Sequence, residues 1–479
     1  MIAFLAVTLP LTLYLAFPSG AWNFDGVACA AALELGDSYF YFHGNHLLYG
    51  FFGFGIWRLV LNPMGIHRAL PALQLFTSLL SAAGLYPLFQ VVRQQLSDDF
   101  SALWVVLAVS VTAVFWVWSL EAQVYALGFL GIAWATYFLF QPPSSEKWVW
   151  VGGSHALAIL GHVLHGVWII PCLYWLWQEN AADPQARQGY LFRYLLTLMG
   201  GVLSLYLLVI AVVILPHQPQ TQSLWHWLLG SAALTPDRHF AWHWAGRRAP
   251  FLWASTSLRV LWGSFWPYAR STSRTLWLLT GASALGWGGV LLCSGRESKT
   301  LPWRFSFLWI LAYGLFLWTW EPRTECYRMS EIIPLAIALS LGAQQIRRRV
   351  IQKLVLSGIF VSTLLVNFYT RISPMHQTEK NALFMEVSEL AAQTPENSIY
   401  LTLGGSPWIY LLYFTGRQAF DLHRAAREPD AFWKDLARQR GQRPVLISTA
   451  ALEDERVKPW LSSFKCYPLA KGLPWQQLQ

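Results

Sequence analysis

The chain has few charged residues and few cysteines for its length. Only 12% of its 479 residues are Asp, Glu, Lys or Arg, whereas 55% are hydrophobic, and the mean hydropathy is +0.37. This composition excludes a soluble fold for the first three quarters of the chain. The five cysteines form no CxxC motif and no even set, so neither a disulfide framework nor a zinc knuckle is indicated.

Basic clusters of the kind that bind nucleic acid are also missing. The net charge is +9, but no Lys/Arg run alternates with exposed aromatic residues on a polar face. We therefore expect no nucleic-acid partner. In a membrane protein, the surplus of positive charge can instead bind anionic headgroups or phosphate-bearing lipids, so membrane lipids are the expected partners.

Apolar stretches close to bilayer length dominate the sequence. About eleven of them alternate with short polar loops between Met1 and Tyr369. A bilayer core about 30 Å thick needs roughly 20 apolar residues per helix. The stretches predict an α-helical polytopic membrane domain over residues 1–370, with outer loops at 18–67 and 216–274.

A run of basic residues gives the strongest signal for orientation. Cytoplasmic loops are enriched in Lys and Arg, and the run consists of Arg347, Arg348, Arg349 and Lys353. Placing it in the cytoplasm puts both long loops on the extracytoplasmic face. Reading Phe251–Tyr268 as a further span would invert everything after it. The interrupting prolines favour an outer loop instead; they are Pro219, Pro236, Pro250 and Pro267.

The last quarter of the chain has the composition of a soluble domain. Asn381–Ala392 has helical periodicity, and Ile399–Leu403 and Val445–Ser448 have the pattern of short buried strands. Residues 371–479 therefore predict a small α/β domain on the extracytoplasmic side. Gly404 and Gly405 are interpreted as a turn, not as a phosphate-binding loop.

Two acidic residues stand out at the predicted outer face. Asp25 follows the first span, and Glu121 ends a very apolar helix. An unpaired carboxylate beside apolar surface is costly unless it has a function or a partner. Two acids that converge at one face can act as base and orienter or can bind a cation. As alternatives, Asp25 can cap the helix that follows it, and Glu121 can simply mark a helix end.

Histidine pairs recur at two predicted outer turns. His43 and His46 have the same i, i+3 spacing as His162 and His165. Such pairs can bind metal, but zinc usually needs a third protein ligand. Hydrogen bonding to a phosphate or hydroxyl is therefore favoured over a metal site, and a structural interfacial role is favoured over both. A further pair with i, i+4 spacing consists of His239 and His243.

The outer segment Trp320–Arg328 carries two arginines that can hold a phosphate. Guanidinium groups bind phosphate oxygens in a bidentate manner, and the residues concerned are Arg323 and Arg328. The alternative is that these arginines pair with the neighbouring acids Glu321, Glu325 and Glu331.

Four segments follow one another in an order known from one family. They are WNFDGVACAAALELG with FHGNHLLYG, then SLEAQVYAL, GHVLHGVWIIP and WEPRTECYRMSEIIPLAIAL. Together they resemble the protein O-mannosyltransferase-like membrane proteins of the GT-C glycosyltransferase superfamily, over roughly Met1 to Tyr369. The resemblance implies a GT-C fold and transfer of a sugar from a polyprenyl-phosphate donor to an acceptor on the outer face.

The resemblance also implies roles for particular residues. Asp25 would be the catalytic base and Glu121 the second acid, whereas His43, His162 and the region of Arg323 would lie near the donor phosphate. Transfer with inversion needs only one base. The chain departs from the family pattern at Ala28, Gly44, Asn45 and Gln123.

Two other classes of function remain open. A polysaccharide polymerase or ligase would also use polyprenyl-linked glycans, and it is favoured by the paired Arg247 and Arg248 in a long outer loop. A transporter or assembly subunit should show internal repeats and mid-bilayer charges, but no internal repeat is visible and the predicted spans are nearly free of mid-helix charge. We expect a multi-pass enzyme of the cytoplasmic (inner) membrane with no resident cofactor, although two acids leave room for a divalent cation. The acceptor can be protein, lipid or glycan.

Overall fold

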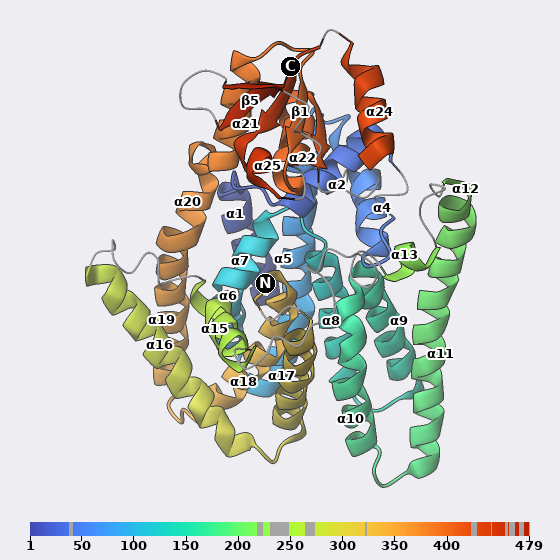
Figure 1. Ribbon diagram of the computed structural model, residues 1–479. Coiled ribbons are helices and arrows are strands. Elements are labelled where there is room, and N and C mark those ends of the chain that lie inside the picture. Colours follow the sequence, from blue (N-terminus) through green and yellow to red (C-terminus); the bar gives the residue numbers. More distant parts are fainter. Residues whose placement is uncertain are drawn as a thin grey trace. The chain divides into compact units, whose positions relative to one another are not determined.

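The chain folds into two compact units (Figure 1). The first comprises Met1–Ser19 and Gly36–Pro374, and the second comprises Gly20–Leu35 and Met375–Gln479. The short segment Gly20–Leu35 thus groups with the C-terminal residues, although it lies within the loop predicted for the membrane domain. The computed structural model describes residues 1–37, 42–217, 224–229, 249–263, 274–320, 323–422, 429–441, 443–455, 458, 465–468 and 474–478.

Helices make up the first unit. They are α1 (Ile2–Ala16), α4 (Leu47–Ile56), α5 (Ala69–Leu96), α6 (Asp99–Ser110), α7 (Ala113–Leu120), α8 (Tyr125–Leu139), α9 (Ser145–Gly161), α10 (Ile169–Glu179), α11 (Pro184–Val209), α12 (Leu215–His217), α13 (Leu224–Leu229), α15 (Ala249–Trp262), α16 (Arg274–Ser294), α17 (Leu301–Thr319), α18 (Ile332–Gln344) and α19 (Arg349–Asn367). Single π-helical turns extend three of them: η1 (Trp57–Leu61), η3 (Ile210–Ile214) and η7 (Phe368–Ile372). Short 3-10 turns form η2 (Val163–Trp168), η5 (Gly295–Glu297) and η6 (Cys326–Glu331).

Side-chain caps fix where several of these helices begin. Asp98 accepts a hydrogen bond from the backbone N–H of Ser101 at the start of α6. Ser144 caps α9, and Asp183 caps α11 just before Pro184. Such caps satisfy backbone N–H groups that have no partner within the helix. Because of its cap, α11 begins at Pro184.

The chain is a multi-pass membrane protein. Within the described ranges, six helical segments are long and apolar enough to span a bilayer, or seven if α6 and α7, bent by 68°, count as one. Three shorter apolar helices are Ile2–Ala16, Leu47–Leu61 and Tyr125–Leu139. This count is lower than the predicted eleven because several stretches form helices shorter than a bilayer. The stretch at Phe251, which was predicted as outer loop, forms α15, a helix of only 14 residues.

The bend between α6 and α7 is stabilised by remote side chains. A break in a membrane helix leaves carbonyl groups without their intrahelical partners, and these must be satisfied within the protein. The Tyr14 hydroxyl donates to the carbonyl of Ser110 at 2.8 Å, and the Asn367 amide donates to that of Val111 at 2.7 Å. Helices α1 and α19 therefore hold the bend.

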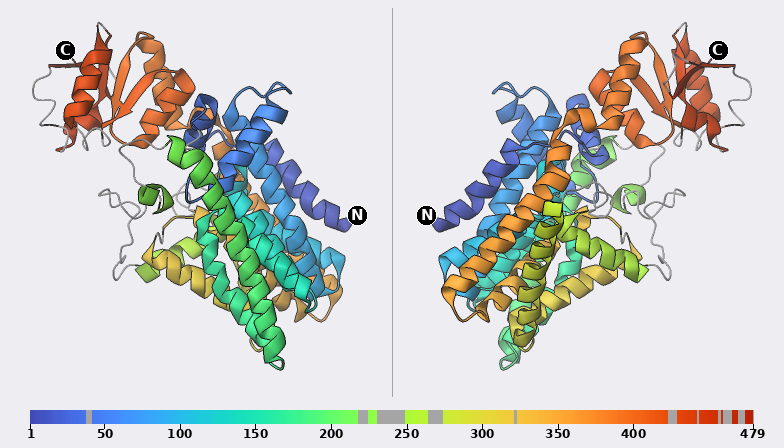
Figure 2. Two further views of the ribbon diagram at one scale, coloured as in Figure 1. Left: turned by 90° about the vertical axis from the view of Figure 1, so that its right-hand side faces the viewer. Right: turned by 90° about the vertical axis from the view of Figure 1, so that its left-hand side faces the viewer.

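Glycines let α8 and α9 approach closely. A Cβ at Gly131 would lie 2.5 Å from the backbone nitrogen of Ala158, and one at Gly161 would lie 2.6 Å from that of Gly128. Small residues permit such backbone contact between membrane helices. Helix α11 packs along the other side of α9 (Figures 1 and 2). This packing fixes the turn after α9, where the second histidine pair lies.

The second unit contains the small sheet expected for the C-terminal domain. Five strands in the described residues have the order β2-β1-β3-β5-β4. They are β1 (Ile399–Thr402), β2 (Gln418–Asp421), β3 (Val445–Ser448), β4 (Cys466–Pro468) and β5 (Trp475–Leu478). Strand β1 is parallel to β2 and β3, with Ile399 opposite Gln418 and Val445, whereas β5 is antiparallel to β3 and β4.

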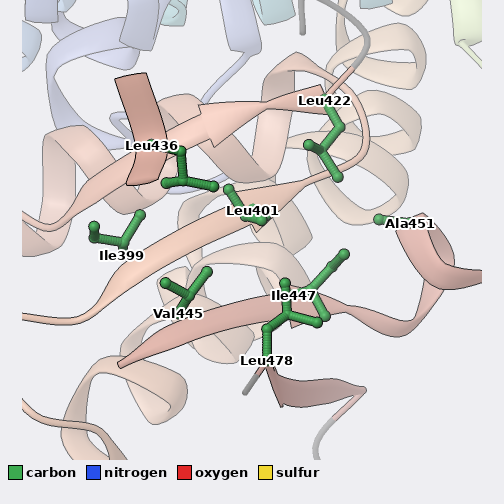
Figure 3. Packing of buried hydrophobic residues seen from close by; sticks show 8 residues of the cluster. All are labelled: Ile399, Leu401, Leu422, Leu436, Val445, Ile447, Ala451 and Leu478. Atoms are coloured by element: carbon green, nitrogen blue, oxygen red, sulfur yellow. The ribbon is translucent and has the colours of Figure 1, made fainter. Parts of the chain in front are cut away.

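Helices and apolar side chains complete this domain. Its helices are α2 (Phe24–Leu35), α21 (Ala382–Gln393), α22 (Gly405–Thr415), α24 (Pro429–Arg440) and α25 (Thr449–Glu453). Figure 3 shows its core, in which side chains from β1, β3, β5 and the neighbouring helices meet. The core residues are Ile399, Leu401, Leu422, Leu436, Val445, Ile447, Ala451 and Leu478. Burial of this apolar surface stabilises the domain.

Candidate functional site

Three of the predicted histidines come together in the first unit. The rings of His43 and His46 stack with their centroids 4.5 Å apart. The backbone N–H of Val163 donates to the carbonyl of Asn45 at 2.9 Å, which joins the turn of the first pair to the turn that carries His162. The three imidazoles are close enough that a positive charge on His43 would lower the pKa of His46 and of His162. We refer to His43, His46 and His162 as the histidine cluster.

Two tyrosines border the histidine cluster. The ring of Tyr125, at the start of α8, lies 5.0 Å from that of His162, and the ring of Tyr327, in η6, lies 5.7 Å away. The two tyrosine rings meet edge to face at 5.6 Å. Four separate segments therefore contribute to one aromatic group, which spacing along the sequence could not reveal.

The histidine cluster presents neutral imidazoles. His162 lies in the turn after α9, outside the candidate spans, and burial together with the neighbouring His43 lowers its pKa to about 3. Burial also lowers the pKa of His46. The Nδ1 atoms of His43 and His162 accept hydrogen bonds from backbone N–H groups of Asn45 and Leu164. A neutral ring that accepts at Nδ1 carries its proton on Nε2, so both residues are donors through Nε2.

His165 has different surroundings from the other three histidines. It is 3% exposed, and its Nδ1 shares a hydrogen bond of 3.0 Å with the Tyr313 hydroxyl. Its carbonyl bonds to His155, and a Cβ at Gly128 would lie 2.5 Å from its Nε2. These contacts favour a packing role for His165.

Metal ligation finds little support in the side chains. No group of three or more His, Cys, Asp or Glu residues in the described part of the chain could hold a metal ion. The pair His239 and His243 lies outside the described residues, as do Arg247, Arg248 and Glu321.

Glu121 is a buried acid with a fixed partner. It follows α7 in an extended conformation, is 3% exposed, and accepts a hydrogen bond of 2.5 Å from the Ser19 hydroxyl. The Ser19 carbonyl in turn accepts from the Gln74 amide at 2.9 Å. The carboxylate is thus held by a chain of polar groups in an otherwise apolar region.

Gln123, one of the positions at which the chain departs from the family pattern, is a buried polar residue. It is 1% exposed, and neither its amide nitrogen nor its amide oxygen has a hydrogen-bond partner among the described residues. The Thr77 hydroxyl forms hydrogen bonds with the backbone of Gln123 but not with its side chain. The Tyr49 hydroxyl in turn forms a hydrogen bond of 2.9 Å with that of Thr77. A buried amide without a partner is costly, and a bound hydroxyl group could satisfy both atoms.

Arg328 is a buried arginine that is only partly paired. It is fully buried, and its Nη1 donates to Glu331 at 3.1 Å and to Ser257 at 3.2 Å. Its Nε and Nη2 atoms have no partner within the described residues. Its guanidinium also lies 5.8 Å from the ring centre of Trp253. Arg328 thus pairs with the neighbouring acid Glu331, yet two of its buried guanidinium nitrogens have no hydrogen-bond partner among the described residues.

The other charges near η6 form a separate group. Glu325 bonds to Arg371 at 2.9 Å and lies 3.6 Å from Arg259. Arg323 is exposed. Of the two arginines singled out in the sequence, Arg328 is therefore the better placed to hold an anion away from water.

Asp25 belongs to the second unit, in the first turn of α2. The residue is exposed, yet desolvation by the surrounding protein raises the pKa of its carboxyl group. The side chain of Asn23 caps the helix, since its oxygen accepts from the backbone N–H of Asp25 at 2.9 Å. Asp25 is thus not needed as the cap. That Asp25 and Glu121, in different units, face one cavity stays a prediction.

Solved structures of another protein share the fold of this chain, whereas comparisons of its sequence found no match. No family model matches the chain, and no curated protein matches its sequence. The structure is similar to the crystal structures of ArnT from Cupriavidus metallidurans bound to undecaprenyl phosphate and in the apo state. Each comparison has a TM-score of 0.64 at 12% identity and covers 99% of this chain and 97% of ArnT. The expected fold class is confirmed: the chain has the GT-C-like fold, helical and polytopic, with a small C-terminal α/β domain.

Proposed function

We propose that this protein is a membrane glycosyltransferase that takes its sugar from a polyprenyl-phosphate donor. One observation carries the proposal: the fold is shared along nearly the whole chain with ArnT, whose crystal structure was obtained with undecaprenyl phosphate. The four ordered sequence motifs support the same class. We further propose that the protein lies in the cytoplasmic membrane, with the site and residues 371–479 on the extracytoplasmic side.

Arg328 and the histidine cluster are proposed to bind the donor phosphate. The unpartnered Nε and Nη2 of Arg328 form one edge of a guanidinium fork, the geometry that suits two phosphate oxygens. In a poorly hydrated site such donors stabilise the charge that builds up on a leaving phosphate. The Nε2 donors of His43 and His162 would add neutral hydrogen bonds. Gln123 would satisfy its amide on a sugar hydroxyl.

Asp25 is proposed as the general base of an inverting transfer. Its carboxylate takes the proton from an acceptor hydroxyl while that oxygen attacks the anomeric carbon. The bond from this carbon to the phosphate oxygen breaks, and polyprenyl phosphate leaves with the bonding electrons. A raised pKa makes Asp25 a better proton acceptor than an ordinary aspartate. Glu121 is proposed as the second acid, held in place by Ser19.

Binding of undecaprenyl phosphate by the purified protein in nanodiscs tests the donor class. We expect saturable binding that Arg328→Lys weakens, because an ammonium cannot replace the two-donor edge of the fork. Arg93→Lys is the matched control, since Arg93 is exposed and paired with Asp99. A protein that neither binds undecaprenyl phosphate nor releases it from any undecaprenyl-phosphate-linked sugar would contradict the proposal.

A further inference from the structure

Trp22 has an unusual backbone conformation three residues before Asp25. Its φ angle is +24°, and in the described part of the chain the other non-glycine residue with positive φ is Ser97. Ser97 has an ordinary reason, because it ends α5 in the left-handed conformation common at helix C-termini. Trp22 ends no helix. A bulky residue in this region costs free energy, and it persists only where its surroundings impose it.

Aromatic residues of the C-terminal segment surround the Trp22 side chain. The indole stacks on Phe414 with centroids 4.7 Å apart and meets the edge of Phe384 at 5.0 Å. Phe384 lies on α21 and Phe414 on α22, and their own rings are 5.0 Å apart. Aromatic contacts of this kind stabilise beyond the area that they bury. The indole is therefore fixed on two sides.

Hydrogen bonds from the same segment hold the backbone around Trp22. The hydroxyl of Tyr410, on α22, donates to the carbonyl of Trp22 and contacts that of Ala21 at 3.4 Å. The Asn381 amide donates to the carbonyl of Gly20 at 3.1 Å, and the N–H of Gly20 donates to Met375 at 2.7 Å. Three successive carbonyls before α2 are thus bound by residues of the C-terminal segment.

We infer that Phe384, Tyr410 and Phe414 form a clamp on Trp22 that positions Asp25, so the C-terminal α/β domain is part of the catalytic apparatus. The inference rests on the proposed function, in which Asp25 is the base. The clamp holds the indole ring and the backbone carbonyl of Trp22, not the Asp25 carboxylate. Without it, Trp22 would relax to negative φ, and the start of α2, from Asn23 to Asp25, would turn away from its present direction. Misplacement of a catalytic group by about 1 Å can reduce turnover about 100-fold.

Two tyrosines on α22 offer a matched test. Tyr410 holds the backbone before α2, whereas Tyr413 donates to Glu34 near the end of that helix at 2.8 Å. Tyr→Phe removes one hydroxyl in each case and keeps the ring. We expect Tyr410→Phe to lower kcat about tenfold or more, with KM for an undecaprenyl-phosphate-linked sugar changed less than twofold. Tyr413→Phe should keep both constants within twofold of the wild type.

Two further measurements separate positioning from general stability. Cys29 lies one helical turn after Asp25 and is buried, so its alkylation by N-ethylmaleimide in the full-length protein reports loosening of α2. We expect faster labelling in Tyr410→Phe and an unchanged rate in Tyr413→Phe. Trp22→Phe should restore most of the kcat that Trp22→Ala loses, since a smaller aromatic ring can still stack on Phe414.

The outcomes distinguish the clamp from the proposed function. Wild-type kcat in Tyr410→Phe, or an equal loss in both tyrosine variants, would overturn the clamp even if Asp25→Asn is inactive. Full activity of Asp25→Asn would remove Asp25 as the base, and with it the positioning role. An inactive Asp25→Asn together with selective loss of kcat in Tyr410→Phe supports both.

Discussion

Glu121 and Asp25 are two acids held in opposite ways. Glu121 is buried among apolar helices, and its carboxylate is bonded directly to Ser19. Asp25 is exposed, and the contacts around it hold the preceding backbone through Asn23, Trp22 and Tyr410. A buried charge needs a fixed partner, which limits the reactions open to it. The difference favours Glu121 as an orienting group and Asp25 as the group that exchanges a proton.

The assignment of Asp25 as the proton-exchanging acid requires that loss of its charge abolish most of the sugar transfer. We expect Asp25→Asn to reduce sugar transfer by roughly 10²- to 10⁴-fold, the usual contribution of a general base. Binding of undecaprenyl phosphate should be unchanged, because the amide keeps the size of the side chain. Release of undecaprenyl phosphate from its sugar conjugate gives the rate. Turnover near the wild-type value would assign the base elsewhere.

A third acid, Glu331, tests whether a buried carboxylate that is directly paired contributes to the stability of the fold. Its partner Arg328 is fully buried, and removing one member of a buried pair destabilises a protein by about 3–5 kcal/mol. We therefore expect Arg328→Met to lower the melting temperature strongly in detergent. The double variant Arg328→Met with Glu331→Met should recover much of that stability but should not bind undecaprenyl phosphate. Recovery of binding in the double variant would exclude Arg328 as the phosphate ligand.

Changing Glu121 sharpens the contrast with Asp25. Glutamine still accepts a hydrogen bond from Ser19, so we expect Glu121→Gln to fold normally and to lose less kcat than Asp25→Asn, because an orienting group exchanges no proton. Assays with and without a chelator separate an orienting role from a cation between the two acids. If Glu121→Gln is as inactive as Asp25→Asn, the division of roles between the acids is wrong.

The pH dependence should separate Asp25 from the histidine cluster. As a base, Asp25 must be ionised, and its raised pKa places the loss of kcat at a pH above the ordinary aspartate value of about 4. His162 has a lowered pKa, so the unfolded chain binds more protons below about pH 6.5, and stability falls as the pH drops through that range. Profiles of kcat and of melting temperature measure the two effects. In His162→Gln the fall in stability should be shallower, whereas the kcat profile should keep its midpoint.

Apolar patterning predicted most of the helices and two of the five strands described in the C-terminal domain. Val445–Ser448 forms β3 as expected, and β1 ends one residue earlier than predicted, at Thr402. Strands β2, β4 and β5 were missed because each is short and takes its register from a neighbouring strand. The bend after Ser110 was also missed, since no proline or glycine marks it and its stabilising partners, Tyr14 and Asn367, are remote in sequence.

The candidate site was only partly predictable for the same reason. The acids and the histidine spacing could be read locally, whereas the meeting of His43 with His162 depends on a backbone bond between Asn45 and Val163. Grouping of Asp25 with the C-terminal unit depends on Trp22 contacts with residues near the end of the chain. Single-sequence patterns report local periodicity and carry no information about such long-range pairs.

The discontinuous second unit has a consequence for biosynthesis. Helix α2 leaves the ribosome early, but the residues that cover its apolar face follow only after Gly36–Pro374 has been made. During that interval α2 lacks its packing against α22, and exposed apolar surface of this kind is prone to misassembly. Proper closure of the α/β domain over α2 would thus act as a late checkpoint, coupling completion of the polypeptide to the appearance of its proposed activity.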